Sequence, residues 1–570
     1  MGQIGLVTNV VEVDQATWTP SAGTKLAAVS EFPGTDDVYV SGSTDTRTVF
    51  MFEDIEKGDS ETAVLVLRVK MDGLGSGQVA VKMYATANDE FTEVADPVSY
   101  ASTAAQFNLE WCLIYKVIHP DVWAEFDPIT SGFAVMKLDD GNSCDIAWMR
   151  LLVQDAAVEQ FPPMMLMDCR AAVTLDTTLR AQEIGAACGI GRGARFGLGS
   201  YDGSSIRRSP NDTPASAYNW SNLEDITDRL IAGTDLDGND RPGHCLMVIG
   251  TDAPNWTTYK NAVGGTWGTE PNRPAPESWV HWAADAQAAV DHIIADYEAA
   301  GLDPTEYCLF QIANEAGIGG AGGPWKSTGP YAYDPPYSGL GEGEHDSAAN
   351  ISDRRNVCDQ LVYLVSNVNF RGCRVLGVAH ETDTDSVAFV NELSSIVDLA
   401  PHLPIINRPA LNHYINVQSG WSLCESSRFV TKYYDSIMYC KTALAAEVEN
   451  VIPGLGWDAL PWALTEFGGT LTKCGMNGSA MPQFGHAKRG EFLARLAERL
   501  LQSGEFEIIS FYATRERSVV TDANLFGLMK SDGTYTLAYR EMAEHFTGTD
   551  ASSPPSGSYS TATGETAGTG

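Results

Sequence analysis

The chain has 570 residues, a formal net charge of −37, and a composition that is 44% hydrophobic and 19% charged. This length predicts two or three domains, and the apolar content is sufficient for large cores and argues against bulk disorder. The negative charge repels phosphate backbones, so we expect no binding to nucleic acid. No run of about 18 apolar residues occurs, so no membrane span is expected.

Cysteine and histidine give no sign of a metal or cofactor site. The 11 cysteines are odd in number and none forms a C-x-x-C pair, so we interpret them as small buried side chains rather than a disulfide scaffold. The 10 histidines are scattered, and no H-E-x-x-H pattern occurs. We therefore predict that the protein needs no metal and no cofactor.

Residues 1–158 predict an all-β domain. Short runs of alternating or apolar residues recur between turn clusters, a pattern typical of a β-sandwich. The runs are 38–40, 48–52, 63–69, 79–84, 107–117 and 146–153.

Three short segments of this region carry a resemblance. Trp18-Thr19-Pro20, residues 36–40 and Arg150-Leu151-Leu152-Val153 are similar to a jelly-roll module of tailed-phage structural proteins. The resemblance implies a domain that attaches the chain to other virion or tail proteins. Carbohydrate-binding modules share the sandwich architecture, and a spacer domain without any ligand is a further alternative.

Residues 159–547 predict an α/β domain in which strands and helices alternate. The two clearest helices are 278–300, where apolar residues recur every three or four positions, and 491–501. Eight strand–helix units favour a (β/α)₈ TIM barrel over an open doubly wound sheet, whose Gly-rich loop after the first strand is missing. Residues 548–570 are rich in Gly, Ser and Thr and predict a flexible tail. The expected strands are 164–169, 194–199, 244–250, 307–313, 374–379, 410–414, 461–465 and 507–513.

Two glutamates follow apolar runs at expected strand ends. Glu315 ends the fourth strand and Glu466 ends the seventh. In a closed barrel these ends meet at one mouth, where the chemistry of such barrels is located. Two carboxyl groups on either side of a sugar bond are the groups that glycoside hydrolysis needs, one protonated and one ionised.

The same segments resemble clan A, the retaining glycoside hydrolases with (β/α)₈ barrels. Ala313-Asn314-Glu315 is similar to the Asn-Glu motif after the clan's fourth strand, which implies that Glu315 is the acid/base and that Asn314 binds the sugar 2-hydroxyl. Residues 464–468, Leu-Thr-Glu-Phe-Gly, are similar to its seventh-strand motif, which implies that Glu466 is the nucleophile. His413 and Tyr414 end the sixth strand where the clan often has these residue types, which implies substrate contacts and a hydrogen bond from Tyr414 to Glu466.

The chain departs from the clan at two strands. The Trp usual at the end of the eighth strand is replaced by Phe511-Tyr512, which leaves the floor of the −1 sugar subsite unassigned. The clan's second-strand Arg has one candidate, Arg195, but it lies near the start of its expected strand and is not assigned. Asp168 ends the first strand, where a lone Asp is interpreted as structural.

The expected function is hydrolysis of a polysaccharide or cell-surface glycan by a retaining mechanism. The chain begins without the basic and long apolar segments of a signal peptide. We therefore favour a phage tail or virion component, or a protein outside the cell after release by lysis, and virion attachment favours a homo-oligomer. The alternatives are a virion adhesin that binds glycan without cleaving it and a bacterial glycosidase of the cytoplasm.

Overall fold

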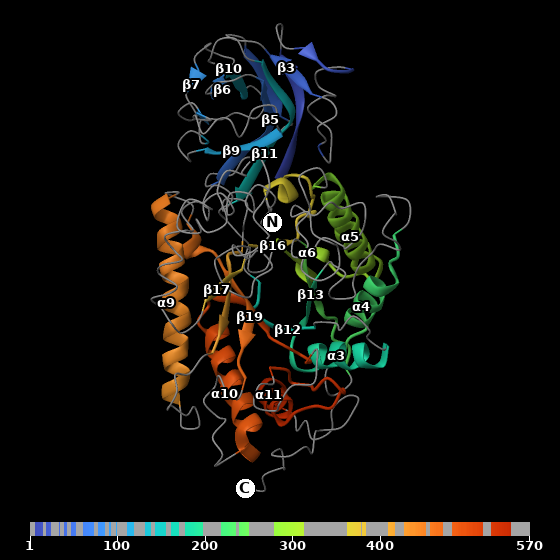
Figure 1. Cartoon of the computed structure of the whole chain (residues 1–570). Helices are drawn as coiled ribbons and strands as arrows, with labels where there is room; N and C mark the ends of the chain where they lie inside the picture. Colours follow the sequence, from blue (N-terminus) through green and yellow to red (C-terminus); the bar gives the residue numbers. More distant parts are fainter. Residues whose placement is uncertain are drawn as a thin grey trace, which may run out of the picture.

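The computed structural model contains an antiparallel β region at the N-terminus and a parallel sheet surrounded by helices in the rest of the chain (Figure 1). The residues that the structure describes are 6–14, 19–23, 34, 39–42, 47–52, 61–72, 78–85, 91–92, 98–99, 111–118, 123, 131–137, 143–155, 161–169, 177–197, 218–234, 239–249, 279–312, 362–377, 379–382, 408–415, 427–451, 456–470, 482–516 and 526–548.

All strand pairs of the N-terminal region are antiparallel. Strand β1 (Leu6–Asp14) pairs with β11 (Ser143–Asp155) through its first half and with β4 (Arg47–Phe52) through its second, so it joins two sheets. The expected runs coincide with strands, except that 38–40 ends where β3 (Val40–Gly42) begins. The described strands fit the all-β prediction, although Trp123 is helical, and the jelly-roll connectivity stays a prediction. The remaining strands are β2 (Thr19–Pro20), β5 (Glu61–Asp72), β6 (Gln78–Ala85), β7 (Phe91–Thr92), β8 (Val98–Ser99), β9 (Trp111–Ile118) and β10 (Ser131–Lys137).

Strand β5 is buried on both faces, because every residue of 63–69 is buried. Alternate residues of a strand face opposite sides of its sheet. Val64 and Val66 of β5 and Trp148 of β11 belong to the same apolar cluster as residues of the parallel-sheet region. One face of this sheet therefore packs against the second part of the chain rather than against solvent.

A parallel barrel forms the second part. Nine described strands have the order β16-β15-β14-β13-β12-β20-β19-β18-β17, and every neighbouring pair is parallel. The first and last strands of this order, β16 (Arg374–Leu376) and β17 (His380–Thr382), are two pieces of one stretch, and the Gly377 amide donates to the carbonyl of Arg408 beside β18 over 2.9 Å. This stretch closes the ring as its fifth strand. The other strands are β12 (Met164–Asp168), β13 (Gly193–Gly197), β14 (His244–Val248), β15 (Cys308–Gln311), β18 (Ala410–Tyr414), β19 (Trp462–Gly468) and β20 (Phe506–Phe511).

All eight expected strands of the barrel are present, with boundaries shifted by a few residues. The largest change is in β19, which runs through Glu466 to Gly468, so Glu466 lies inside the strand and not at its end. The helix expected at 278–300 is α5 (Trp279–Ala299), whereas α10 (Pro482–Gln502) begins well before the expected position, with Pro482 as its first residue. The other helices are α3 (Thr177–Ile190), α4 (Ser221–Ile231), α6 (Pro304–Tyr307), α9 (Ser427–Val451), η5 (Trp457–Ala459) and α11 (Leu537–Thr547).

The barrel interior has an apolar layer and, at the amino ends of the strands, an ionic one. The apolar layer comprises alternate strand residues, among them Leu166, Ala463 and Ile508. At the amino ends, Glu507 accepts from Arg374 over 2.5 Å and from Arg408 over 2.9 Å, and all three side chains are buried. The described part of the interior is thus filled with side chains, and its ionic groups lie toward the ends of the strands.

No helix among the described residues is long and apolar enough to cross a membrane. Six cysteines, Cys169, Cys188, Cys245, Cys308, Cys373 and Cys440, have described side chains and are buried, as the interpretation of small apolar side chains requires.

Candidate active site

A bulge in strand β19 turns Glu466 into the barrel. Ala463 belongs to the interior apolar layer and Leu464 to the cluster outside the barrel, so strict alternation would point Glu466 outward. The pairing register with β18 shifts between Leu411/Leu464 and Asn412/Glu466, which leaves Thr465 as an extra residue. The Thr465 hydroxyl donates to Asn412 Oδ1 over 2.8 Å. The bulge therefore reverses the alternation and brings the carboxylate to the interior face.

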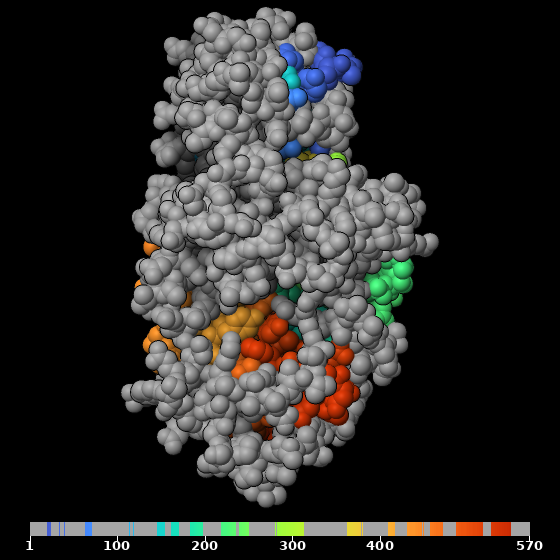
Figure 2. Space-filling model, in the orientation of Figure 1, coloured from blue at the N-terminus to red at the C-terminus, as the bar shows by residue number. Residues whose placement is uncertain are grey.

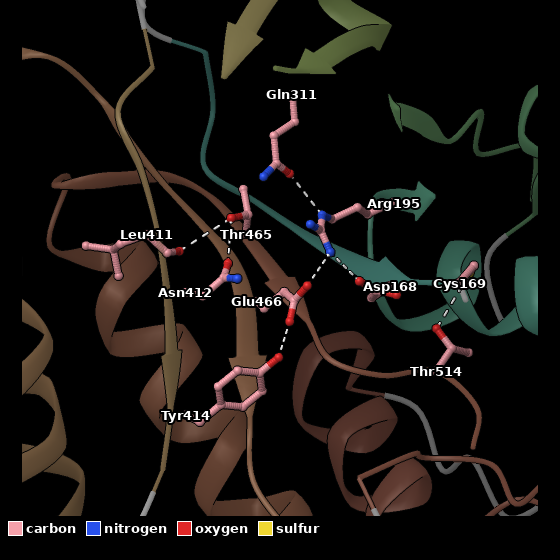
Figure 3. Close-up of polar contacts among 10 residues, drawn as sticks. All are labelled: Asp168, Cys169, Arg195, Gln311, Leu411, Asn412, Tyr414, Thr465, Glu466 and Thr514. Atoms are coloured by element: carbon pink, nitrogen blue, oxygen red, sulfur yellow. Dashed lines mark hydrogen bonds and ion pairs between the residues drawn. The ribbon is translucent and has the colours of Figure 1, made fainter. Parts of the chain in front are cut away.

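Two donors hold the Glu466 carboxylate (Figure 3). Arg195 Nη1 lies 3.0 Å from Oε1, and the Tyr414 hydroxyl donates to Oε2. The glutamate residue is 1% exposed. A positive charge and a hydrogen-bond donor both favour the ionised carboxylate. The hydrogen bond from Tyr414 to Glu466 that the sequence predicts is thus present.

Arg195 is the organising cation of the site. Its guanidinium also forms an ion pair with Asp168 at the end of β12 and donates from Nε to Gln311 Oε1 over 3.0 Å (Figure 3). Arg195 lies at the centre of β13 and beside Glu466, not near the start of its strand as the sequence predicts. Asp168, interpreted from the sequence as structural, belongs to this network, and so does Gln311, to which the sequence assigns no role.

Tyr414 is one of three aromatic rings that pack against one another. The ring of Tyr414 packs edge-on against Tyr512 at 5.6 Å and against Phe526 at 5.8 Å between centroids, and Tyr512 and Phe526 pack edge-on at 5.5 Å. All three residues are half-buried, so each presents part of its surface outward. Tyr512 follows β20 directly, where the clan usually has a Trp. Tyr512 is, like Phe526, a half-exposed aromatic side chain beside Tyr414.

In the space-filling view, the gold and red parts of the chain, which are far apart in sequence, reach the surface side by side in the lower half of the molecule (Figure 2). The barrel order explains this proximity, because β18 and β20 both neighbour β19.

His413 is not brought into the site. Its side chain is fully buried, and strand alternation places it on the face of β18 opposite to that of Asn412 and Tyr414. Burial lowers the pKa of His413 to about 4, so the imidazole is neutral at neutral pH. A neutral, fully buried imidazole can support the strand but has no path to a substrate in this conformation.

Asn314 and Glu315 lie outside the described residues, which stop at Ile312 in this part of the chain. Their roles and the separation of the carboxyl groups of Glu315 and Glu466 remain predictions. Within the described residues, no cluster of three or more His, Cys, Asp or Glu side chains has the arrangement of a metal site. The described groups therefore position one buried carboxylate, Glu466, at the carboxyl ends of the barrel strands.

Comparison with known proteins gives only distant structural similarity. No protein-family model matches the sequence, and no curated protein matches it. Among solved structures, the CBM22-1 and GH10 modules of a Clostridium thermocellum endo-1,4-beta-D-xylanase bound to xylohexaose align over 95% of this chain and 98% of that one, with 11% identity and a TM-score of 0.38. A psychrophilic family 10 endo-beta-1,4-xylanase aligns over 67% of this chain and 96% of its own length, with 10% identity and a TM-score of 0.38.

A family 39 glycoside hydrolase from the gut symbiont Bacteroides cellulosilyticus aligns over 84% of this chain and 80% of its own length, with 11% identity and a TM-score of 0.36. These TM-scores are too low to carry an argument about fold or function. The barrel is established by the strand pairing, and any function must rest on the side chains around Glu466.

Proposed function

We propose that the chain is a retaining glycoside hydrolase that cleaves a polysaccharide, with Glu466 as nucleophile and Glu315 as acid/base. The observation that carries the proposal is the environment of Glu466. It is a buried carboxylate in the seventh strand of a parallel barrel, and Arg195 and Tyr414 each hold one of its oxygens. An ion-paired, oriented carboxylate is suited to attack an anomeric carbon.

The proposed reaction has two steps. Glu466 attacks the anomeric carbon and forms a glycosyl ester while Glu315 gives its proton to the departing glycosidic oxygen. Glu315, now ionised, then takes a proton from water, and the resulting hydroxide displaces Glu466 from the sugar. Both displacements invert the anomeric centre, so the product keeps the configuration of the substrate.

The residues around Glu466 supply orientation in this scheme. The Tyr414 hydroxyl can remain bound to one oxygen of Glu466 while the other oxygen, which lies 3.0 Å from Arg195 Nη1, attacks. Tyr512 offers a half-exposed ring to the apolar face of a sugar. Asn314 binds the sugar 2-hydroxyl, a contact that strengthens in the transition state.

The test is incubation with a panel of bacterial surface and plant polysaccharides. Hydrolysis is measured as newly released reducing ends, and the anomeric configuration of the first product is measured by proton NMR. We expect Glu466→Gln to lower kcat by at least about 10³-fold, because the nucleophile is lost while the shape is kept. Glu505→Gln is the matched control, since Glu505 is a partly exposed carboxylate that pairs with Lys441 away from the site. Activity in Glu466→Gln equal to that of the wild type would refute the proposal.

A glycan-binding protein without catalysis is the alternative from the sequence. It predicts binding on a glycan array by the wild type and by Glu466→Gln alike, with no reducing ends released by either. A mechanism-based fluoroglycoside that labels Glu466 in the wild type would exclude it, because labelling requires nucleophilic attack.

The proposed setting is a phage tail or virion, with residues 1–158 attaching the chain to other particle proteins, and with action on glycan outside the cell. This part of the proposal rests on the resemblance of the N-terminal segments alone. Mass spectrometry of purified phage particles, compared with the soluble lysate, tests it. Recovery of the chain only in the lysate would favour a cytoplasmic glycosidase.

A further inference from the structure

One dipeptide beside the site, Phe526-Gly527, has its backbone held from both sides. Both of its amides donate to Glu516 Oε1, the Gly527 amide over 2.6 Å. Both of its carbonyls accept from the guanidinium of Arg489, the Gly527 carbonyl over 2.9 Å and the Phe526 carbonyl over 3.3 Å. We define Arg489 and Glu516 as the clamp on this dipeptide.

Arg489 connects the clamp to the strand of the proposed nucleophile. It is fully buried on helix α10, and its Nη1 also donates to the carbonyl of Gly469, which directly follows β19, over 3.4 Å. The same guanidinium thus fixes the chain after Glu466 and the chain around Phe526. Arg is suited to this task, because its planar fork serves several oxygens at once, whereas Lys is a single charged point.

The backbone at Gly527 is packed too closely against its neighbours to accept a side chain. A Cβ at this position would lie 2.6 Å from the Met529 carbonyl oxygen and 2.9 Å from the Glu516 amide nitrogen. The segment is further held where the Leu528 amide donates to the Ala513 carbonyl over 3.1 Å, next to Tyr512. Backbone hydrogen bonds therefore join residues 513–516 to residues 526–529 after strand β20.

Phe526 is connected to Glu466, the proposed nucleophile, through the ring of Tyr414. Phe526 packs edge-on against Tyr414, whose hydroxyl donates to Glu466. Phe526 also packs against Tyr512, the candidate sugar platform. A displacement of Phe526 would release both tyrosine rings.

We propose that Arg489 and Glu516 are positioning residues for the active site: they fix Phe526, which sets the ring of Tyr414 and so the orientation of the Glu466 carboxylate. The inference rests on the proposed role of Glu466 for its kinetic consequence, but the placement of Tyr414 can be measured without any substrate.

The substrate-free measurement is fluorine NMR of protein labelled with 3-fluorotyrosine, in which the signal missing from Tyr414→Phe identifies Tyr414. We expect Glu516→Ala and Arg489→Lys to shift or broaden this signal, with Glu516→Gln intermediate because its amide oxygen can still accept. Arg495→Ala is the matched control, since Arg495 lies on the same helix and pairs with Glu491 at the surface. Because Glu516→Gln preserves the size and shape of the side chain, we expect it to fold. It can therefore still test the proposal if Arg489→Lys does not fold.

The kinetic measurement uses whichever polysaccharide the wild type cleaves. We expect Glu516→Ala to lower kcat about tenfold with KM within about twofold, because misorientation of a reacting group is costly even when binding is retained. A Tyr414 signal and a kcat that are unchanged in Glu516→Ala and Arg489→Lys would overturn the positioning role. A wild type that cleaves no glycan would refute the proposed function, while the fluorine signals would still decide whether the clamp places Tyr414.

Discussion

Arg195 and Glu466 form a 3.0 Å ion pair inside the barrel although 271 residues separate them in the chain. Their side chains are 4% and 1% exposed. Removing two charges from water is costly, and a buried pair is tolerated where further hydrogen bonds satisfy both partners. Arg195 also donates hydrogen bonds to Asp168 and Gln311, and Glu466 also accepts a hydrogen bond from Tyr414.

The first prediction concerns the geometry of this network. Arg195→Lys keeps the charge, but one ammonium group cannot reach Asp168, Gln311 and Glu466 together. We expect kcat on a cleaved polysaccharide to fall about 100-fold or more, with a smaller change in KM, because Glu466 loses its orientation. Arg192→Lys is the control, since Arg192 is exposed just before the same strand. A kcat within twofold of the wild type would mean that charge alone is sufficient.

The role of Arg195 could have been predicted from the sequence by strand alternation. Ala194 and Phe196 are apolar and face the helices, so the intervening Arg195 has to face the interior. The eight barrel strands are predictable because each is a short apolar run with a helix pattern after it. The bulge at Thr465 is not predictable in this way, since a period-two pattern in β19 would point Glu466 outward.

The contacts of Gln311, Arg489 and Glu516 were beyond the sequence for a different reason. Gln311 contacts a residue 116 positions away, Arg489 contacts residues 20 or more positions away, and Glu516 contacts residues 10 and 11 positions away. Nothing in the local pattern marks these residues as partners. The hydrogen bond from Tyr414 was predictable only through the family resemblance, and His413, assigned in the same way, is turned away from the site by the strand itself.

The second prediction concerns the buried Glu507, which we expect to matter for stability but not for activity. Glu507→Gln leaves Arg374 and Arg408 without their carboxylate at the amino ends of the strands. Breaking a buried ion cluster from one side costs about 3–5 kcal/mol, so we expect a clear fall in the midpoint of urea denaturation.

At urea concentrations below that midpoint, the kcat of Glu507→Gln should stay near that of the wild type. The reason is that Glu507, Arg374 and Arg408 lie at the other end of the barrel from Glu466. Glu298→Gln is the stability control, since its ion pair with Arg371 is exposed on both sides and contributes little. Equal denaturation midpoints for the two variants would show that Glu507 is not needed to neutralise the arginines.

The third prediction concerns acid stability. Burial lowers the pKa of His244 and of His413 to about 4 and, with the charges of Arg489 and Lys530, that of His486 to about 2. Each histidine has a pKa near 6.5 in the unfolded chain, so below this pH the unfolded state binds more protons than the folded state. Their contribution to stability is therefore complete above pH 6.5 and is lost as the pH falls toward the folded pKa.

Between pH 6.5 and pH 5 each of these histidines should lower the free energy of unfolding by about 2 kcal/mol. Urea denaturation of the wild type and of His413→Gln at the two pH values measures this. The free energy of unfolding of the variant should depend less on pH, because unfolding of the variant takes up close to one proton fewer than unfolding of the wild type. Parallel pH dependences would contradict the burial of a neutral imidazole at this position.

The last prediction concerns the contact between the N-terminal sheets and the barrel. The Gly34 amide donates to Asn367 Oδ1 over 2.8 Å, and its carbonyl accepts from the Tyr363 hydroxyl over 2.6 Å. The ring of Tyr363 also packs edge-on against Trp148 of β11 at 5.6 Å. A Cβ on Gly34 would lie 2.2 Å from Trp148 Cδ1, so Gly34→Ala must displace this indole.

Overpacking of this kind costs about 1–3 kcal/mol. Because one apolar cluster spans both parts, we expect the wild type to unfold in a single calorimetric transition and Gly34→Ala to lower and split it. Tyr363→Phe, which removes only the hydroxyl, should lower the transition less and leave it single. The contrary outcome is two resolved transitions in the wild type, the lower of which keeps its temperature in Gly34→Ala. The N-terminal region would then be an independent module that this contact does not couple to the barrel.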